Sequence, residues 1–274
     1  MRHAGHSPSR DRIIGALLLV LFTPLLYAQD GKDLDAYKFR ISANWYFVHP
    51  TGSIQGKDNS GTFDLNKDFH FTDYSTFSGS LDWRFARKHH LTFTTSPISF
   101  SRTATLNRTV QFSGRTFDVN TQATAEINYL SFAPGYQYDL IRRNHGYVAI
   151  AAQVNFLSTE ASITATSTVN GQTTTRRASQ SLLAPIPILG PHIRWYPLSN
   201  SNRLSFDGSI HGMYFFGYGN FVSADGSMGI GLTHHLNLKL GYQMGSRFDI
   251  HGVSDQLGVR LTEKGPLAGL EFSW

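Results

Sequence analysis

Apolar and polar residues alternate one by one along several stretches of this sequence. Between Leu204 and Tyr214 every even-numbered residue is apolar or glycine, and the odd-numbered residues from 205 to 211 are Ser, Asp, Ser and His. Comparable alternation covers residues 37–47, 77–85, 222–232, 236–244 and 268–274. A period of two is that of a β-strand, and helical spacing fits none of these stretches. The pattern therefore predicts strands with one apolar and one polar face.

Short polar breaks join these strands in pairs. Four of them look alike, at residues 86–90, 141–145, 198–202 and 233–235. Each is followed at once by an alternating stretch, as in the tight turns of hairpins. Four such turns joining five hairpins predict an all-β, antiparallel, up-and-down barrel of about ten strands. Eight strands is the alternative, if the stretches 204–214 and 222–232 form one bent hairpin.

The connections at the other end of the predicted barrel are longer. A strand from 146 to 168 would span ~75 Å at ~3.3 Å per residue, more than the ~25 Å apolar band of a membrane barrel. We therefore expect the hairpin around Asn170-Gly171, and the one around 112–115, to project into the medium as extracellular hairpins. The loop 50–73 is the longest irregular stretch, and either lies on the surface or folds inward as a plug.

Composition agrees with a barrel that crosses a bilayer. Aromatic residues make up 13%, charged residues only 16%, and the mean hydropathy is −0.23. A barrel averages a lipid-facing and a water-facing surface, so a near-neutral value is expected. The chain has no cysteine, which leaves no disulfide framework and no thiolate metal site. Neither histidine spacing nor a glycine-rich loop indicates a metal or a nucleotide, so we expect no cofactor.

The first residues have the features of an export signal. Arg2, Arg10 and Arg12 precede an apolar segment of 14 residues, 13–26, which is too short for the ~20 residues of a spanning helix. We predict a signal peptide at 1–28, a short periplasmic segment at 29–36 and the barrel at 37–274. Cleavage removes three Arg and one Asp and leaves a formal charge of +3, too weak to indicate nucleic-acid binding.

The last ten residues, GPLAGLEFSW, end the alternation on an aromatic side chain. This stretch resembles the C-terminal assembly signal of bacterial outer-membrane β-barrels, and Gly269, Phe272 and Trp274 match that pattern. Aromatic side chains are favoured at the headgroup boundary of a bilayer. We expect this strand to close the barrel against the first strand.

A broader resemblance covers most of the chain. The segments FDLNKDFHF, SGSLDWRFARKHHLTF and PIPILGPHIRWYP resemble segments shared by a group of small outer-membrane barrels of uncharacterised function. The resemblance implies a place in the bacterial outer membrane, with membrane lipids, lipopolysaccharide and the barrel-assembly machinery as partners. It brings no catalytic residue. We expect a monomer that binds no nucleic acid.

The polar face of the strands predicts the lining of the lumen. Its candidate residues are Lys38, Arg40, Asp82, Arg84, Arg194, Asp207, Ser209, His211, Lys239 and Glu271. Tyr37 is placed on the outer face by the same alternation. A ten-stranded barrel is only slightly wider than the eight-stranded barrel that side chains just fill. We therefore expect ion pairs that plug the lumen or leave a narrow path.

Asp207, Ser209 and His211 share the inner face and raise the question of a hydrolase, such as one that deacylates lipid A. Neighbours on one face lie ~7 Å apart along the strand, whereas a working Ser-His pair needs ~2.6 to 3.2 Å. A polar row that forms ion pairs across the lumen is the preferred interpretation. We predict no catalytic residue.

The prolines of LAPIPILGP are the second unusual feature. Pro185, Pro187 and Pro191 fall within one strand, and proline cannot donate to a hydrogen-bonded ladder. Unpaired backbone groups are costly in hydrocarbon. Either the prolines open a lateral gap between lumen and bilayer, or they fix a bulge that curves the strand.

The sequence leaves three functions open. A passive barrel with a structural, surface or small-ligand binding role is preferred to a selective conduit for a small or apolar solute with a lateral opening. A lipid-modifying enzyme is the third alternative.

The assignment of faces can be tested by substitution. Replacing Phe206 or Leu238 by Arg should hinder insertion far more than the same change at Ser209 or Gln243, because Arg on the lipid face costs ~2 to 4 kcal/mol near the midplane. Folding yields into lipid vesicles measure the difference. Equal yields for the two groups would show that the faces are assigned wrongly.

Overall fold

The computed structural model describes residues 33–56, 61–169, 172–198, 200–215, 219–250 and 258–274. The predicted signal peptide at 1–28 and the Asn170-Gly171 turn lie outside these residues. In the described part of the chain, no helix is long and apolar enough to cross a membrane.

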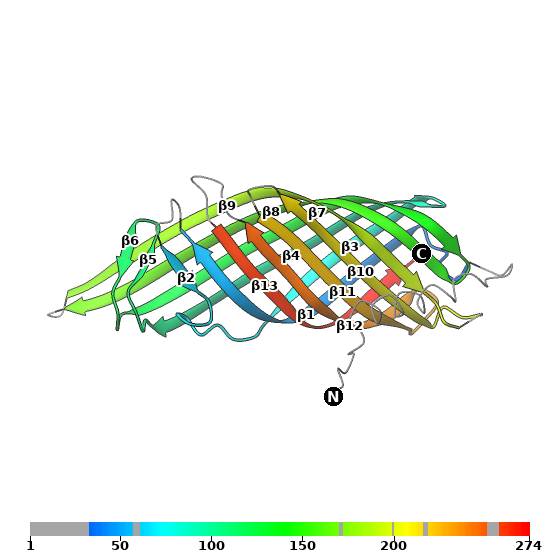
Figure 1. Cartoon of the computed structure of the whole chain (residues 1–274). Helices are drawn as coiled ribbons and strands as arrows, with labels where there is room; N and C mark the ends of the chain where they lie inside the picture. The colour runs from blue at the N-terminus through cyan, green and yellow to red at the C-terminus, as the bar shows by residue number, and fades with distance from the viewer. Residues whose placement is uncertain (1–32, 57–60, 170–171, 199, 216–218, 251–257) are drawn as a thin grey trace, which may run out of the picture.

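Ten long antiparallel strands form a closed barrel (Figure 1). They are β1 (Phe39–Gln55), β3 (Tyr74–Ala86), β4 (His89–Thr105), β7 (Gln122–Arg143), β8 (Gly146–Val169), β9 (Gln172–Trp195), β10 (Leu204–Phe215), β11 (Gly219–Gly231), β12 (Leu236–Ile250) and β13 (Gly258–Ser273). Each pairs with the next in this order, and β13 pairs with β1 to close the barrel. The prediction of ten strands is confirmed, and the eight-stranded alternative is wrong. All four predicted turns join neighbouring strands.

The outer surface of the barrel is apolar because the strands keep the predicted alternation. On β1, Ile41, Trp45 and Phe47 are exposed, whereas Ser42 and Asn44 between them are buried in the interior. At the end of the barrel where Phe39 and Trp274 lie, aromatic rings meet on the outside: the Phe39 ring stacks on Trp83 and Trp274, and Trp195 stacks on Phe206. Such a girdle is typical of a barrel at the headgroup boundary.

The strands differ in length, so one side of the barrel is taller than the other. β7, β8 and β9 have 22, 24 and 24 residues, whereas β10, β11 and β12 have 12, 13 and 15. In Figure 1 β8 and β9 extend well beyond β10 to β12. These long strands are the predicted protruding hairpins.

Two loops pack into the mouth of the barrel beneath this extension. One contains β2 (Thr62–Asp64), which pairs with the end of β1, and the other is the hairpin of β5 (Val110–Phe112) and β6 (Arg115–Phe117). Apolar side chains from both loops are fully buried against inward-facing residues of β4, β7, β8 and β9. The rings of Phe69 and Phe112 pack on Phe63 with centroids 5.5 and 5.2 Å away. We call the loop residues of this cluster the apolar plug: Phe63, Leu65, Phe69, Phe71, Leu106, Val110, Phe112 and Phe117.

Of the two alternatives for the loop 50–73, the inward one therefore holds for its described residues. The hairpin expected to project around 112–115 has its tip exposed at Gly114 and Arg115, but Phe112 beside the tip packs into this cluster. Phe112 has no exposed surface, because it packs on the Phe63 ring among the buried apolar side chains of this cluster.

Candidate functional site

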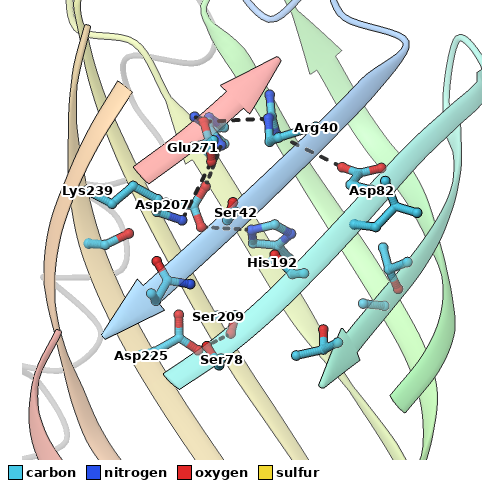
Figure 2. Close-up of a pocket in the computed structure, with 18 of the residues that line it drawn as sticks. Arg40, Ser42, Ser78, Asp82, His192, Asp207, Ser209, Asp225, Lys239 and Glu271 are labelled. Atoms are coloured by element: carbon cyan, nitrogen blue, oxygen red, sulfur yellow. Dashed lines mark hydrogen bonds and ion pairs between the residues drawn. The ribbon is translucent and has the colours of Figure 1, made fainter. Parts of the chain in front are cut away.

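The interior of the barrel near its chain ends is filled by charged side chains (Figure 2). Arg194 on β9 lies at the centre and is almost fully buried. Its guanidinium binds both oxygens of the Glu271 carboxylate, and its Nη1 lies 3.2 Å from Asp207 Oδ2. Lys239 Nζ and Arg40 Nε approach Glu271 at 3.7 and 3.6 Å. The strands β1, β9, β10, β12 and β13 each contribute one of these groups, so the network ties the barrel walls together.

Asp35 joins this network from the N-terminal segment, ahead of the first strand. Its carboxylate pairs with Arg40, lies 3.1 Å from Arg142 Nη2, and accepts a hydrogen bond of 2.8 Å from the Tyr196 hydroxyl. Burial alone would raise the pKa of Asp35, but Arg40, Arg194 and Arg142 outweigh it and lower the pKa below the ordinary value. Asp35 is therefore a carboxylate held by three cations, and we call Asp35, Arg40, Arg142, Arg194 and Glu271 the ionic plug.

A second set of groups completes this layer. The imidazole of His90 lies between two carboxylates, with Nδ1 2.9 Å from Asp82 and Nε2 3.2 Å from Asp139. Tyr37 donates its hydroxyl to Asp82, and Arg142 Nη1 lies 2.8 Å from Asp139. All these groups are hydrogen-bonded to one another, as buried polar groups must be. His90 and Arg142 therefore each lie beside a carboxylate of this layer.

The predicted lumen residues have three different positions in the structure. Most line the interior: Arg40, Asp82, Arg194, Asp207, Ser209, His211, Lys239 and Glu271. Arg84 lies at the rim, where its Nη1 donates to the backbone oxygen of Asp35 at 2.9 Å.

Lys38 is a correction, since it is exposed on the outside with its Nζ 5.9 Å from the centre of the Phe39 ring. Tyr37, expected outside, is buried instead. The strand begins only at Phe39, so the alternation does not extend to these two residues.

Sequence reasoning missed several members of the network. They are Asp35, His90, Asp139, Arg142, Tyr147, His192 and Tyr196. His192 lies two residues before Arg194, so extending the alternation along β9 would have found it. Arg142 has no such signal, because a register shift between Asp139 and Ile141 brings both Asp139 and Arg142 to the inner face.

Ser209 and His211 come closer than their backbone spacing suggests. Ser209 Oγ lies 3.2 Å from His211 Nδ1 and donates to Asp225 Oδ1 at 2.6 Å. The expectation that the serine and histidine side chains lie too far apart is therefore wrong. Asp207 does not join them and pairs with His192 and Arg194 instead. The carboxylate contacts the serine rather than the histidine, so the acid–imidazole–hydroxyl order of a hydrolytic triad is not formed among these described residues.

Two polar cavities lie between the ionic plug and the apolar plug. Their volumes are about 210 and 260 Å³. They share Ser209, His211 and Asp225 in their linings, and we call them together the central chamber. His211 Nε2 is a buried nitrogen with no hydrogen-bond partner in the described part of the chain. His211 itself lines both cavities, so its ring lies beside space that water or a ligand group could occupy.

The prolines of β9 affect only one of its two neighbours. The ladder between β8 and β9 is continuous. The ladder between β9 and β10 lacks the pairs Pro191–Ile210 and Gly190–His211 and, among the described residues, ends at Leu189–Gly212. Both missing pairs need the N–H that Pro191 lacks, so this missing donor faces β10.

The backbones of β9 and β10 nevertheless remain in close contact beside Pro191. A Cβ added to Gly190 would lie 1.8 Å from the carbonyl oxygen of Ile210, so the two backbones are in close contact there. Pro185 and Pro187 lie beyond the last pair and have no such glycine beside them. Of the predicted assembly signal, Gly269 and Phe272 lie on β13 and Trp274 directly follows it; Phe272 and Trp274 are exposed, and Gly269 packs against the backbone of Ala43.

In the described residues, no group of three or more His, Cys, Asp or Glu side chains is arranged to hold a metal ion.

Comparison with solved structures identifies the architecture. The outer membrane protease OmpT from Escherichia coli matches with a TM-score of 0.56 and 10% identity, over 90% of this chain and 99% of that chain. The chain has the fold of a bacterial outer-membrane β-barrel. The attachment invasion locus protein Ail of Yersinia pestis (9% identity, 86% of this chain and 99% of that chain, TM-score 0.33) and the toluene transporter TodX of Pseudomonas putida (7%, 91% and 92%, 0.36) are also similar. No family model and no curated protein matches the sequence.

The ionic plug predicts a specific dependence of barrel stability on Asp35. Asp35→Asn removes a buried carboxylate from three cations and should cost about 3 to 5 kcal/mol of unfolding free energy. Asp33→Asn is the control, because the Asp33 side chain is 37% exposed and should contribute below about 1 kcal/mol. Urea unfolding from lipid vesicles measures both.

The same pair of proteins tests the charge state. Because the pKa of Asp35 lies below its ordinary value of 3.8, the stabilisation is complete above about pH 4 and is lost as the pH falls through the lowered pKa. The difference between wild type and Asp35→Asn should therefore be constant at neutral pH and shrink in strong acid. A difference that does not change with acid would mean that the Asp35 charge is not what stabilises the plug.

Proposed function

We propose that this outer-membrane barrel binds a small ligand in its central chamber and does not act as a general diffusion pore. The observation that carries the proposal is the closure of the lumen at both ends. Charged side chains fill the end near the chain termini, and aromatic side chains of two loops fill the other. A solute would have to break buried ion pairs at one end and bury itself among phenylalanines at the other.

The chamber between the plugs supports a binding role over a purely structural one. A barrel that served only as a wall would be most stable with its interior filled, because empty polar volume loses packing contacts. Here serines, threonines and His211, whose Nε2 has no hydrogen-bond partner in the part of the chain that the structure describes, line two adjoining cavities. A few placed polar groups in an enclosed space are typical of a small-molecule site.

We also propose that the Ser209 cluster binds rather than catalyses. Asp225 accepts the Ser209 hydrogen bond directly, so it holds the serine proton instead of orienting His211 to remove it. The short Ser209–His211 contact is the single observation in favour of a lipid-modifying enzyme, and it deserves a direct test.

Conductance measurements test the closed lumen. Wild-type protein in planar bilayers should give no steady channel current, because both plugs are built from buried contacts. A combined variant, Phe63→Ser, Phe112→Ser and Arg194→Ala, weakens both plugs and should give stepwise currents. An open general porin in the same bilayer is the control. Steady wild-type channels would contradict the proposal.

Mass spectrometry of lipid A tests the enzymatic alternative. Cells with and without the protein should yield lipid A with the same acyl chains. A loss of acyl chains in cells that make wild-type protein, but not in cells that make Ser209→Ala, would show that the cluster is catalytic.

A further inference from the structure

The hydrogen bonds of Ser209 determine which nitrogen of the His211 ring carries a proton. The Ser209 hydroxyl has a single proton and donates it to Asp225 Oδ1 at 2.6 Å. In the contact of 3.2 Å between Ser209 Oγ and His211 Nδ1, the serine oxygen is therefore the acceptor and Nδ1 is the donor. In a neutral ring the other nitrogen, Nε2, is then an acceptor.

The neutral form of His211 agrees with its surroundings. His192, on the neighbouring strand, forms an ion pair of 3.1 Å with Asp207. His211 forms no such pair with any carboxylate in the described part of the chain, and its Nδ1 contacts a serine hydroxyl instead. No ion pair therefore holds the His211 ring in its charged form. Its Nε2 is a buried acceptor that has no partner among the described residues.

A second buried acceptor lines the same cavity. Asn44 Oδ1 on β1 also has no hydrogen-bond partner among the residues that the structure describes. Asn44 and His211 both line the cavity of about 210 Å³, and they come from strands that are not neighbours in the barrel. A buried acceptor without a partner costs free energy, and most buried polar atoms have one. These two acceptors suit a guest that donates hydrogen bonds from more than one of its groups.

Most of the other lining groups are polar but uncharged. Hydroxyl and amide side chains make up more than half of the residues that line the cavity of about 260 Å³, and Ser78, Thr94 and Gln153 line both cavities. Such groups can donate as well as accept. A guest that matches them has both functions in each of its polar groups, which is a property of the alcohol hydroxyl.

The charged groups at the edge of the chamber favour a neutral guest. Arg194 pairs with Glu271 and Asp207, and Lys239 also lies beside Glu271. Because both signs of charge are present and paired, a guest with a net charge would lose its hydration and gain no unpaired counter-ion there. Tyr46 lines both cavities and adds an aromatic side chain against which C–H groups can pack.

We propose that the central chamber binds a neutral polyhydroxylated molecule of about the size of one sugar ring, whose hydroxyl groups donate to His211 Nε2 and Asn44 Oδ1. Each cavity is smaller than the ~300 Å³ at which pockets for drug-sized ligands begin, so the guest is small. This inference rests on the proposed closed chamber and names the chemical class of its ligand.

Equilibrium dialysis with labelled sugars tests the ligand class. The protein is refolded into phosphatidylcholine nanodiscs in the presence of radiolabelled glucose, N-acetylglucosamine or myo-inositol, because both plugs hinder entry after folding. It is then dialysed against the same solution. Wild-type protein should retain an excess of at least one of the three. Cyclohexanol, a ring with a single hydroxyl, should bind at least tenfold more weakly. No excess of any of the three would overturn the proposal.

Two variants test the acceptors. His211→Phe and Asn44→Leu each remove one acceptor and keep a side chain of similar size. Each should weaken binding of the retained sugar about tenfold, which is about 1.4 kcal/mol, because one hydroxyl of the guest loses its partner. His234→Phe is the matched control, since His234 is exposed in the turn before β12, and it should leave binding unchanged.

Binding is expressed per folded barrel, which heat-modifiable migration on a gel measures for each variant. A variant that folds poorly is thereby separated from one that folds and does not bind. Wild-type affinity in both His211→Phe and Asn44→Leu would overturn the assignment of the two acceptors.

Charged sugars test the neutrality of the guest. Glucosamine and gluconate keep most of the hydroxyl groups of glucose and add a positive or a negative charge. Both should bind about tenfold more weakly than the best of the neutral sugars. Tighter binding of either one would show that the chamber recognises charge, and the neutral class would be wrong.

The two proposals fail in different ways. If no sugar binds and the wild type does not conduct, the ligand class is wrong while the closed lumen stands. If the wild type gives steady channel currents, the proposed function itself is wrong, whatever the sugars do.

Discussion

Every backbone N–H and C=O in the hydrocarbon layer needs a partner within the protein, and this constraint shapes the whole molecule. It requires the last strand to pair with the first, and the pairing of β13 with β1 over nearly its whole length meets that need. It also gives each proline within a strand a structural consequence, because each proline removes one N–H donor from the hydrogen-bonded ladder to one neighbouring strand. One of these missing donors, that of Pro191, faces β10.

Closing ten strands creates an interior that must then be filled. The barrel fills its two ends by different chemistry. Near the chain termini, strands from all around the wall contribute charges, and Asp35 supplies the carboxylate that three arginines share. At the far end, the extended strands turn alanines, leucines and isoleucines inward, and the two loops cover them with aromatic rings. Between these layers neither chemistry dominates, and that is where the chamber remains.

Much of this could be predicted from the sequence, because alternation is a local property. The strands, the turns, the ten-stranded count and the inward position of Arg194 or Glu271 follow from a period of two. The errors at Tyr37 and Lys38 come from extending that period past the strand's first residue. The inward position of Arg142 could not be predicted, because the register shift between Asp139 and Ile141 reverses which residues after it face the interior. The apolar plug had a local signal in the sequence. Phe63, Leu65, Phe69 and Phe71 recur in one loop, and such a cluster of apolar side chains is unfavourable in contact with water.

What no local pattern could supply is which residues meet across the lumen. Asp225 on β11 meets Ser209 on β10 only because the register between the two strands sets them opposite each other. A serine next to a histidine suggests catalysis, yet the position of the carboxylate decides the chemistry. With Asp225 on the hydroxyl, Nε2 of His211 has no hydrogen-bond partner among the described residues. The same contact that argues against a nucleophile therefore leaves a polar group available for a ligand.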